Sequence, residues 1–279
     1  MTVGVVCDTA CDLPSPLAAD LGVVLVPLRV RFGETEFVDR EELTTKEFWA
    51  RCAVSPTLPE TSAPSPGAFA AAFGALEAAG AEGVVCVTLS SKLSASNEAA
   101  SHAAREFTTL PVTVVDSLSA TIGEGMICMA VAQAASGGAA MAEVVAAAES
   151  TRERLSVFGA IDTLENLRRG GRIGGAAAAF GTLLSIKPVV EVRNGVVEQE
   201  SRQRTRARSL HYLADKVRAV APVERLAAMS ANAPDFPEFL EMLGDIETDH
   251  PRVVGDIGPV VGTHAGPGAI GVAWVARDR

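Results

Sequence analysis

Several sequence patterns that identify common enzyme and metal-binding classes are missing from this chain of 279 residues. It has no H-E-x-x-H, no histidine and cysteine cluster with zinc spacing, no G-x-x-x-x-G-K-[ST] phosphate loop and no G-x-S-x-G nucleophile elbow. The sequence therefore predicts no metal site, no cofactor and no ATP site of the P-loop kind.

Positive charge is also in deficit, with 24 Lys and Arg against 34 Asp and Glu and a net charge of −10. Such a chain repels a phosphodiester backbone, so we expect no nucleic-acid partner. The five cysteines include no C-x-x-C, and Cys7, Cys86 and Cys128 lie within apolar runs, as reduced structural thiols do.

Signals for export and for the membrane are missing too. The first residues carry no basic stretch and no cleavage pattern, and they pass directly into an expected strand. The uncharged run at residues 125–142 is rich in alanine and contains Gln133 and glycines, which favours a buried helix over a membrane span of roughly 20 apolar residues. We expect a cytoplasmic protein with no stable membrane insertion.

Short valine-rich runs alternate with longer alanine-rich stretches, which is the pattern of a parallel sheet flanked by helices. Residues 29–38, with Gly33 between two alternating runs, predict a hairpin that could extend to another part of the molecule. The expected strands are residues 3–7, 23–30, 84–88 and 112–115, and the expected helices are residues 66–79, 94–107 and the run after Gly123.

The pattern changes after a helix expected at residues 143–155. A glycine-rich stretch at 170–175 is followed by two valine-rich runs that flank Asn194-Gly195, a two-residue hairpin signal. We therefore expect two α/β domains that pack directly against each other. Residues 1–155 would hold the parallel sheet, and residues 156–279 would hold a mixed or antiparallel sheet.

Hydroxyl and carboxyl side chains cluster where expected strands give way to helices, at residues 8–9, 61–66, 90–96 and 116–117. In an open parallel sheet such junctions share the carboxyl edge, where ligands bind. Helix N-termini favour an anion there, and uncharged O–H donors suit a carboxylate or a phosphate. Helix capping is the alternative for each cluster taken alone, and Ser65-Pro66 is a good capping pair.

Two further motifs involve glycine. Residues 266–271 match G-x-G-x-x-G, but the chain ends before the acidic residue about 20 positions further on that a dinucleotide-binding unit requires. We interpret residues 263–268 as a turn before a final strand at 269–275, which would bring His264 close to a ligand or leave it as a structural hydrogen-bonding residue. Gly170-Gly171-Arg172 places a planar cation where it could reach an anion, unless Arg172 is a surface residue at a helix end.

Arginine recurs at every second position from Arg202 to Arg208. On a strand these four side chains would share one face, which is either solvated or a docking patch for a phosphate-handling partner.

The resemblance to a known family rests on an ordered set of short motifs. They are CDTACDLP at 7–14, TSAPSPG at 61–67, SSKLS at 90–94, VDS at 115–117 with Gly123 and Gly125, LRRGGRI at 167–173, LLSIKP at 183–188, RTR at 204–206 and GTHAGPG at 262–268. In this order they resemble the DegV family of bacterial fatty-acid-binding proteins, which includes the binding subunit of two-component fatty acid kinase.

The resemblance implies two α/β domains with an acyl chain buried between or beneath them and a carboxylate at the polar end. Thr61 and Ser94 would donate hydrogen bonds to the carboxylate, with Ser62 close by, and His264 and Arg172 would line the same mouth. The apolar tunnel could be formed by Phe158, Ile161, Leu164 and residues 176–180 and 183–186, for which ordinary core is the alternative.

In the family the head group is offered to a separate ATP-binding kinase subunit that forms an acyl phosphate, and Arg204 would belong to the surface that meets it. The chain departs from the family at Ala95, where glycine is usual, and at Ala63, commonly glutamine. An alternative function is a hydrolase or acyltransferase that uses Ser94 or Thr61 as nucleophile and His264 as base.

Overall fold

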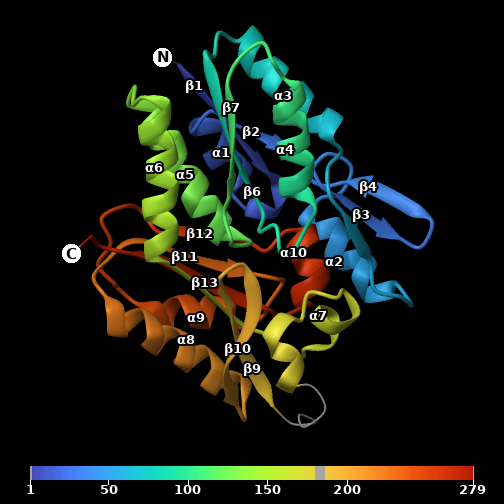
Figure 1. Cartoon of the computed structure of the whole chain (residues 1–279). Helices are drawn as coiled ribbons and strands as arrows, with labels where there is room; N and C mark the ends of the chain where they lie inside the picture. The colour runs from blue at the N-terminus through green and yellow to red at the C-terminus, as the bar shows by residue number, and fades with distance from the viewer. Residues whose placement is uncertain (1, 180–185, 279) are drawn as a thin grey trace.

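The computed structural model describes residues 2–179 and 186–278, which form three β-sheets with helices packed around them (Figure 1). The first sheet is parallel throughout, with strand order β2-β1-β6-β7. Its strands are β1 (Val3–Asp8), β2 (Val23–Val26), β6 (Gly83–Thr88) and β7 (Val112–Asp116). The prediction of a parallel sheet from the valine-rich runs is therefore confirmed.

Helices cover both faces of the parallel sheet (Figure 1). Val6 and Val84 point to one helical layer, whereas Val5 and Val85 point to the other. A strand that is buried on both faces has a continuous run of apolar residues, and this is the pattern by which the strands were predicted from the sequence. The first layer is α3 (Pro66–Ala78) and α4 (Ser96–Glu106), and the second is α5 (Ile122–Ser136) and α6 (Met141–Arg154).

The second sheet has six strands in the order β10-β9-β8-β13-β11-β12. Only the β11–β12 pair is parallel, so this is the expected mixed sheet. Asn194 and Gly195 join β9 to β10 with φ angles of 50° and 82°, as a two-residue hairpin turn requires. The strands are β8 (Leu155–Ala160), β9 (Lys187–Arg193), β10 (Val196–Gln203), β11 (Val223–Ser230), β12 (Val253–Asp256) and β13 (Ile270–Ala276).

Two helices, α8 (Arg206–Val220) and α9 (Phe236–Leu243), cover one face of the mixed sheet, and the other face turns toward the parallel sheet. The largest hydrophobic core contains side chains of both sheets, including Val87 from β6 and Val190 and Ala273 from the mixed sheet. The division into domains at residues 155 and 156 stays a prediction.

A third, small antiparallel sheet has the order β4-β3-β5, with β3 (Arg29–Phe32), β4 (Thr35–Val38) and β5 (Glu60–Ser62). The hairpin predicted at residues 29–38 is confirmed as β3 and β4, and β3 contacts α10 (Pro259–Ala265). The single strand expected at residues 23–30 is wrong. The run splits after Val26 because Pro27 has no N–H to continue a ladder, and its two parts join different sheets.

Four short helices complete the described elements: α1 (Ser15–Asp20), α2 (Thr45–Val54), α7 (Glu165–Arg169) and α10, together with the 3₁₀ segments η1 (Thr9–Cys11) and η2 (Gly174–Ala179). The uncharged run at residues 125–142 confirms the expected buried helix only in part. Residues 125–132 lie in the buried part of α5, whereas residues 133–142, which end α5 and begin α6, are half-buried or exposed. Within the described ranges, none of the helices combines the length and apolar character that a membrane span needs.

Candidate ligand-binding site

A cavity lies between the carboxyl edge of the parallel sheet and the mixed sheet. Its empty space is about 1110 Å³, including an open mouth. The walls are mostly aliphatic and come from both halves of the chain, for example Leu28, Leu89, Val157, Ile161, Val190 and Val260. A concave space with walls of this aliphatic character suits an apolar molecule.

The five predicted ligand residues lie in the wall of this one cavity. Thr61, Ser62, Ser94, Arg172 and His264 come from four separate segments, and the fold brings them together. Of the apolar residues expected in the tunnel, Phe158 and Ile161 line the cavity. Leu164 is buried in the main core, and Phe180 and residues 183–185 lie outside the described residues.

Thr61 reaches the cavity from β5, not from the edge of the parallel sheet as expected. Its strand pairs with β3, where Val30 is the register partner of Thr61. The prediction placed Thr61 at a strand-to-helix junction because the capping pair Ser65-Pro66 follows it. That part of the prediction is correct, since Ser65 caps α3 and its Oγ accepts from Ala68 N at 3.2 Å. A polar strand of three residues has no hydrophobic pattern by which it could be recognised.

His264, near the end of α10, contacts Thr61 directly. Its Nε2 lies 2.9 Å from Thr61 Oγ1. Burial, and then the positive charge of Arg172, lower the pKa of His264 to about 4, so the ring is neutral at pH 7. Its Nδ1 has no hydrogen-bond partner in the described part of the chain and faces Gly170, where an added Cβ would overlap it.

This arrangement favours one tautomer. A proton on Nδ1 would be a buried donor without an acceptor, whereas a proton on Nε2 is donated to Thr61 Oγ1. The hydroxyl proton of Thr61 is then left to donate to another acceptor. Thr61 and His264 together can therefore offer an uncharged O–H to a ligand oxygen.

Ser94 ends a tight turn that follows β6, where the N–H groups of Leu93 and Ser94 both donate to Ser90 O. Its Oγ accepts from Ser96 N at 3.2 Å and lies 3.0 Å from Ser96 Oγ, so Ser94 braces the first residue of α4. The capping alternative is wrong in the strict sense, because Ala95 is the N-cap residue and has no side-chain cap. It also lines the cavity, and the bond from Ser96 N is compatible with ligand contact because a hydroxyl both accepts and donates.

Arg172 is held against the same turn. Its Nε donates to Leu93 O at 2.9 Å and its Nη1 to Gly170 O at 2.7 Å. Gly170 ends α7, and Gly171 has a φ of +69°, which lets the chain turn back so that the guanidinium reaches the cavity. The helix-end interpretation is correct for the glycines, but Arg172 is part-buried and is not a free surface residue.

The side chains of the remaining polar clusters accept hydrogen bonds from backbone N–H groups. Asp8 accepts from Ala10 N at 3.0 Å and Leu89 N at 2.9 Å, and Asp116 Oδ1 accepts from Ser91 N at 3.2 Å and Leu118 N at 3.0 Å. These bonds fix the loops that carry cavity residues.

Asp12 plays a similar part that the sequence did not reveal. It is buried, with a φ of 50°, and accepts from Thr121 Oγ1 at 2.6 Å and from Gly258 N at 2.9 Å at the start of α10. It therefore ties the loop after β1 to the helix that carries His264. The only sequence signal was that Asp tolerates the left-handed conformation better than most residues.

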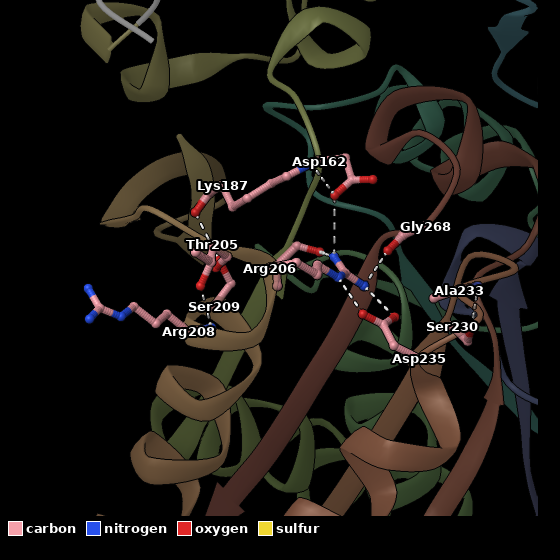
Figure 2. A network of polar contacts seen from close by, with 11 residues as sticks. Asp162, Lys187, Thr205, Arg206, Arg208, Ser209, Ser230, Ala233, Asp235 and Gly268 are labelled. Carbon is pink, nitrogen blue, oxygen red and sulfur yellow. Dashed lines mark hydrogen bonds and ion pairs between the residues drawn. The ribbon is translucent and has the colours of Figure 1, made fainter. Parts of the chain in front are cut away.

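The alternating arginines do not share a face, because the row crosses from β10 into α8. Arg206 is tied to Asp235 by bonds of 2.9 and 3.0 Å and to Gly268 O by a bond of 2.6 Å, as Figure 2 shows. This network holds the turn that follows His264. Arg204 lies exposed in the bend between β10 and α8 and is not in the cavity wall.

A second, more polar pocket adjoins the cavity. It shares Thr61, Arg172 and His264 with the cavity and is otherwise lined by residues such as Asn166 and Arg169. The cavity therefore has an aliphatic body and one polar end that borders an open, charged space. An amphipathic molecule with a small acidic head group fits this distribution.

The chain matches known proteins along nearly its whole length. A family model described as "Uncharacterised protein, DegV family" matches residues 2–277. A DegV domain-containing protein of Streptomyces coelicolor is 34% identical over 99% of this chain and 99% of its own length.

Solved structures agree. One described as the fatty acid binding of a DegV family protein from Thermus thermophilus has a TM-score of 0.90 at 34% identity and covers 99% of this chain and 100% of that one. A DegV family protein from Ruminococcus gnavus, described with vaccenic acid, has a TM-score of 0.85 at 26% identity, with 98% of this chain and 99% of that chain covered. The predicted resemblance is confirmed, and the chain belongs to the DegV family.

Proposed function

We propose that this protein binds a long-chain fatty acid, with the acyl chain in the aliphatic cavity and the carboxylate at its polar end. The observation that carries the proposal is the convergence of Thr61, Ser94, Arg172 and His264 on one end of an otherwise apolar cavity. Thr61 and Ser94 donate O–H groups to the carboxylate, and Arg172 supplies the positive potential. Ser62 is next to Thr61 in β5, but its exposed hydroxyl donates to Glu36 Oε1 at 3.5 Å.

The energetics favour a long chain. Each methylene removed from water contributes roughly 0.8 kcal/mol, so ten of them contribute about 8 kcal/mol. This outweighs the cost of desolvating a carboxylate whose oxygens are hydrogen-bonded. The Thermus thermophilus and Ruminococcus gnavus relatives, described with fatty acid binding and with vaccenic acid, support the same ligand class.

We further propose that the bound carboxylate is presented to a separate ATP-dependent kinase subunit, which converts it to an acyl phosphate in the cytoplasm. This part rests on the resemblance to the binding subunit of fatty acid kinase. The polar pocket beyond Thr61 and His264 supports it, since a carboxylate at that border can be approached from outside. Arg204, exposed and next to the end of β10, is the residue we assign to the kinase-facing surface.

The alternative, a hydrolase or acyltransferase, finds support in the contact between Thr61 and His264. It lacks two requirements of nucleophilic catalysis. Nδ1 of His264 has no orienting carboxylate among the described residues, and a pKa of about 4 makes the ring a weak base. The binding role is therefore favoured.

Binding is tested with the full-length protein after removal of copurified lipid, by calorimetric titration with palmitic acid. Thr61→Val with Ser94→Ala should lower the affinity at least tenfold, since two hydrogen bonds to a charged group are lost. Ser65→Ala, which removes only the cap of α3, is the matched control and should not change the affinity. Steady hydrolysis of a palmitoyl ester, abolished by Ser94→Ala or Thr61→Val, would instead establish the alternative.

Presentation to a kinase is tested separately. The protein loaded with palmitic acid is mixed with ATP and soluble extract of its own host, and acyl phosphate is trapped as the hydroxamate. We expect no product from the isolated protein with ATP, and less product with Arg204→Ala than with the exposed control Arg208→Ala. Equal yields from the two variants would contradict the assignment of Arg204.

A further inference from the structure

Two glycines face each other in the wall of the cavity. Gly159 of β8 and Gly271 of β13 are register partners on neighbouring antiparallel strands, so both would direct a side chain to the same face of the sheet. Both line the cavity, as do Val190 and Ile257, which lie nearest to their Cβ positions. The pair therefore leaves a bare strip of backbone in the wall that the mixed sheet contributes.

The backbone does not require glycine at either position. Neither residue is among those with a positive φ, and both lie in regular strands where any residue fits. A protein with glycine in the interior of a strand is less stable than the same protein with alanine there. Glycine at such a position often marks a place where a ligand or another backbone segment approaches closely.

Packing of the protein does not require glycine there either. A Cβ at Gly159 would lie 3.6 Å from Val190 Cγ2, and a Cβ at Gly271 would lie 3.8 Å from Ile257 Cδ1 and from Met229 Cβ. These are ordinary van der Waals separations.

Other glycines of the fold differ in this respect. A Cβ at Gly262 would lie 2.8 Å from the ring of Trp49, and one at Gly258 would lie 2.7 Å from Asp12 Oδ1. Those glycines are explained by neighbouring protein atoms, whereas the space above Gly159 and Gly271 belongs to the cavity.

We propose that the acyl chain of a bound fatty acid lies directly over the backbone of Gly159 and Gly271, and that these two residues set the width of the tunnel at that depth. The inference rests on the proposed function and adds to it the residues that determine which chains fit. A methyl group at either position would occupy space that the acyl chain needs, while filling a gap in the empty protein.

The test uses Gly159→Ala, Gly271→Ala and the double variant. Each is stripped of copurified lipid, and two quantities are measured: the melting temperature of the lipid-free protein and the affinity for palmitic acid. We expect a melting temperature that is unchanged or higher by about 1–3 °C. We expect the affinity to fall about tenfold for each single variant, because the added methyl overpacks the occupied tunnel.

Gly74→Ala is the matched control. Gly74 lies inside α3, and a Cβ there would have its nearest contact at 4.0 Å, to the ring of Phe107, away from the cavity. It should raise the melting temperature without changing the affinity.

Three results are distinguishable. An affinity within twofold of the unsubstituted protein would overturn the inference, because the chain would then not pass over the pair. A fall in melting temperature would also overturn it, since glycine would then be needed by the fold. Failure of the unsubstituted protein to bind palmitic acid would instead refute the proposed function.

Discussion

Replacing Asp12 with asparagine removes one ionisable group from the buried junction between the loop after β1 and the start of α10, while keeping its shape. Oδ1 of the asparagine still accepts from Gly258 N. Its amide can donate to Thr121 Oγ1 when the threonine hydroxyl turns around, so both hydrogen bonds of the junction survive. The variant therefore isolates the effect of charge.

The magnitude follows from the pKa of Asp12. Burial raises it from 3.8 to about 7, against the opposing effects of the bond from Thr121 and the charge of Arg40. Each pKa unit corresponds to about 1.4 kcal/mol, so the shift amounts to about 4 kcal/mol. The folded protein holds the proton more tightly than the unfolded chain. This stabilisation is fully present below pH 4 and is lost as the pH rises from about 4 to about 7.

The assay is urea unfolding of both proteins at pH values from 4.5 to 8. The difference in free energy of unfolding between Asp12→Asn and the parent protein should increase with pH, in favour of the variant, and level off above pH 7. Burial also raises the pKa of Asp8 and of Asp39, each to about 6, but both are present in the two proteins and largely cancel in the difference. A difference that is flat, or that falls with pH, would refute the reasoning.

Three further substitutions test individual contacts. Gly170→Ala should lower the affinity for palmitic acid about tenfold, because a Cβ would displace His264. Gly67→Ala in α3 should leave the affinity unchanged, since its Cβ would meet only Ser65 Oγ, at an ordinary contact distance of 3.8 Å. Equal affinities of the two variants would contradict the placement of His264. Burial raises the pKa of Glu124 well above its usual range and so favours the uncharged form, which Glu124→Gln imitates. This variant should change the free energy of unfolding by less than about 1 kcal/mol, and a larger loss in urea unfolding would contradict an uncharged Glu124. Arg206→Lys removes the two-bond contact with Asp235 and should lower the free energy of unfolding by about 1–3 kcal/mol in the same assay. An unchanged free energy of unfolding would show that the turn at Gly268 does not depend on Arg206.

The sequence predicted the sheets well where side chains are buried on both faces. β1 and β6 are continuous, almost fully buried valine-rich runs, whereas β7 is a valine-rich run that is mostly half-buried. The turn at Asn194 and Gly195 has a strong local preference. It failed for β5, because a strand of polar residues is fixed by its pairing with β3 and carries no pattern of its own.

The sequence named candidate residues that the fold brings to one cavity, but it did not give their geometry, and their role as ligand residues stays a prediction. Asp8 ends β1 and Ser94 lies in the turn after β6, and both belong to polar clusters that follow a strand. Only the folded structure shows that Asp8 supports the backbone while Ser94 lines the cavity. The contact between Thr61 and His264 joins residues 203 positions apart, which no local pattern could reveal. Similarly, the alternating pattern of arginines from Arg202 to Arg208 does not distinguish Arg206, which is bonded to Asp235, from the exposed Arg204.

The position of β13 affects the order in which the molecule can be completed during synthesis. This strand is made after every other strand of the mixed sheet, yet it lies between β8 and β11 near the middle. Until it emerges from the ribosome, β8 and β11 each have an unpaired edge, and such edges invite pairing with other chains. Until β13 is made, the nascent protein also lacks Gly271 and, shortly before that, His264, so the cavity is complete only after this last strand of the described chain has been synthesised.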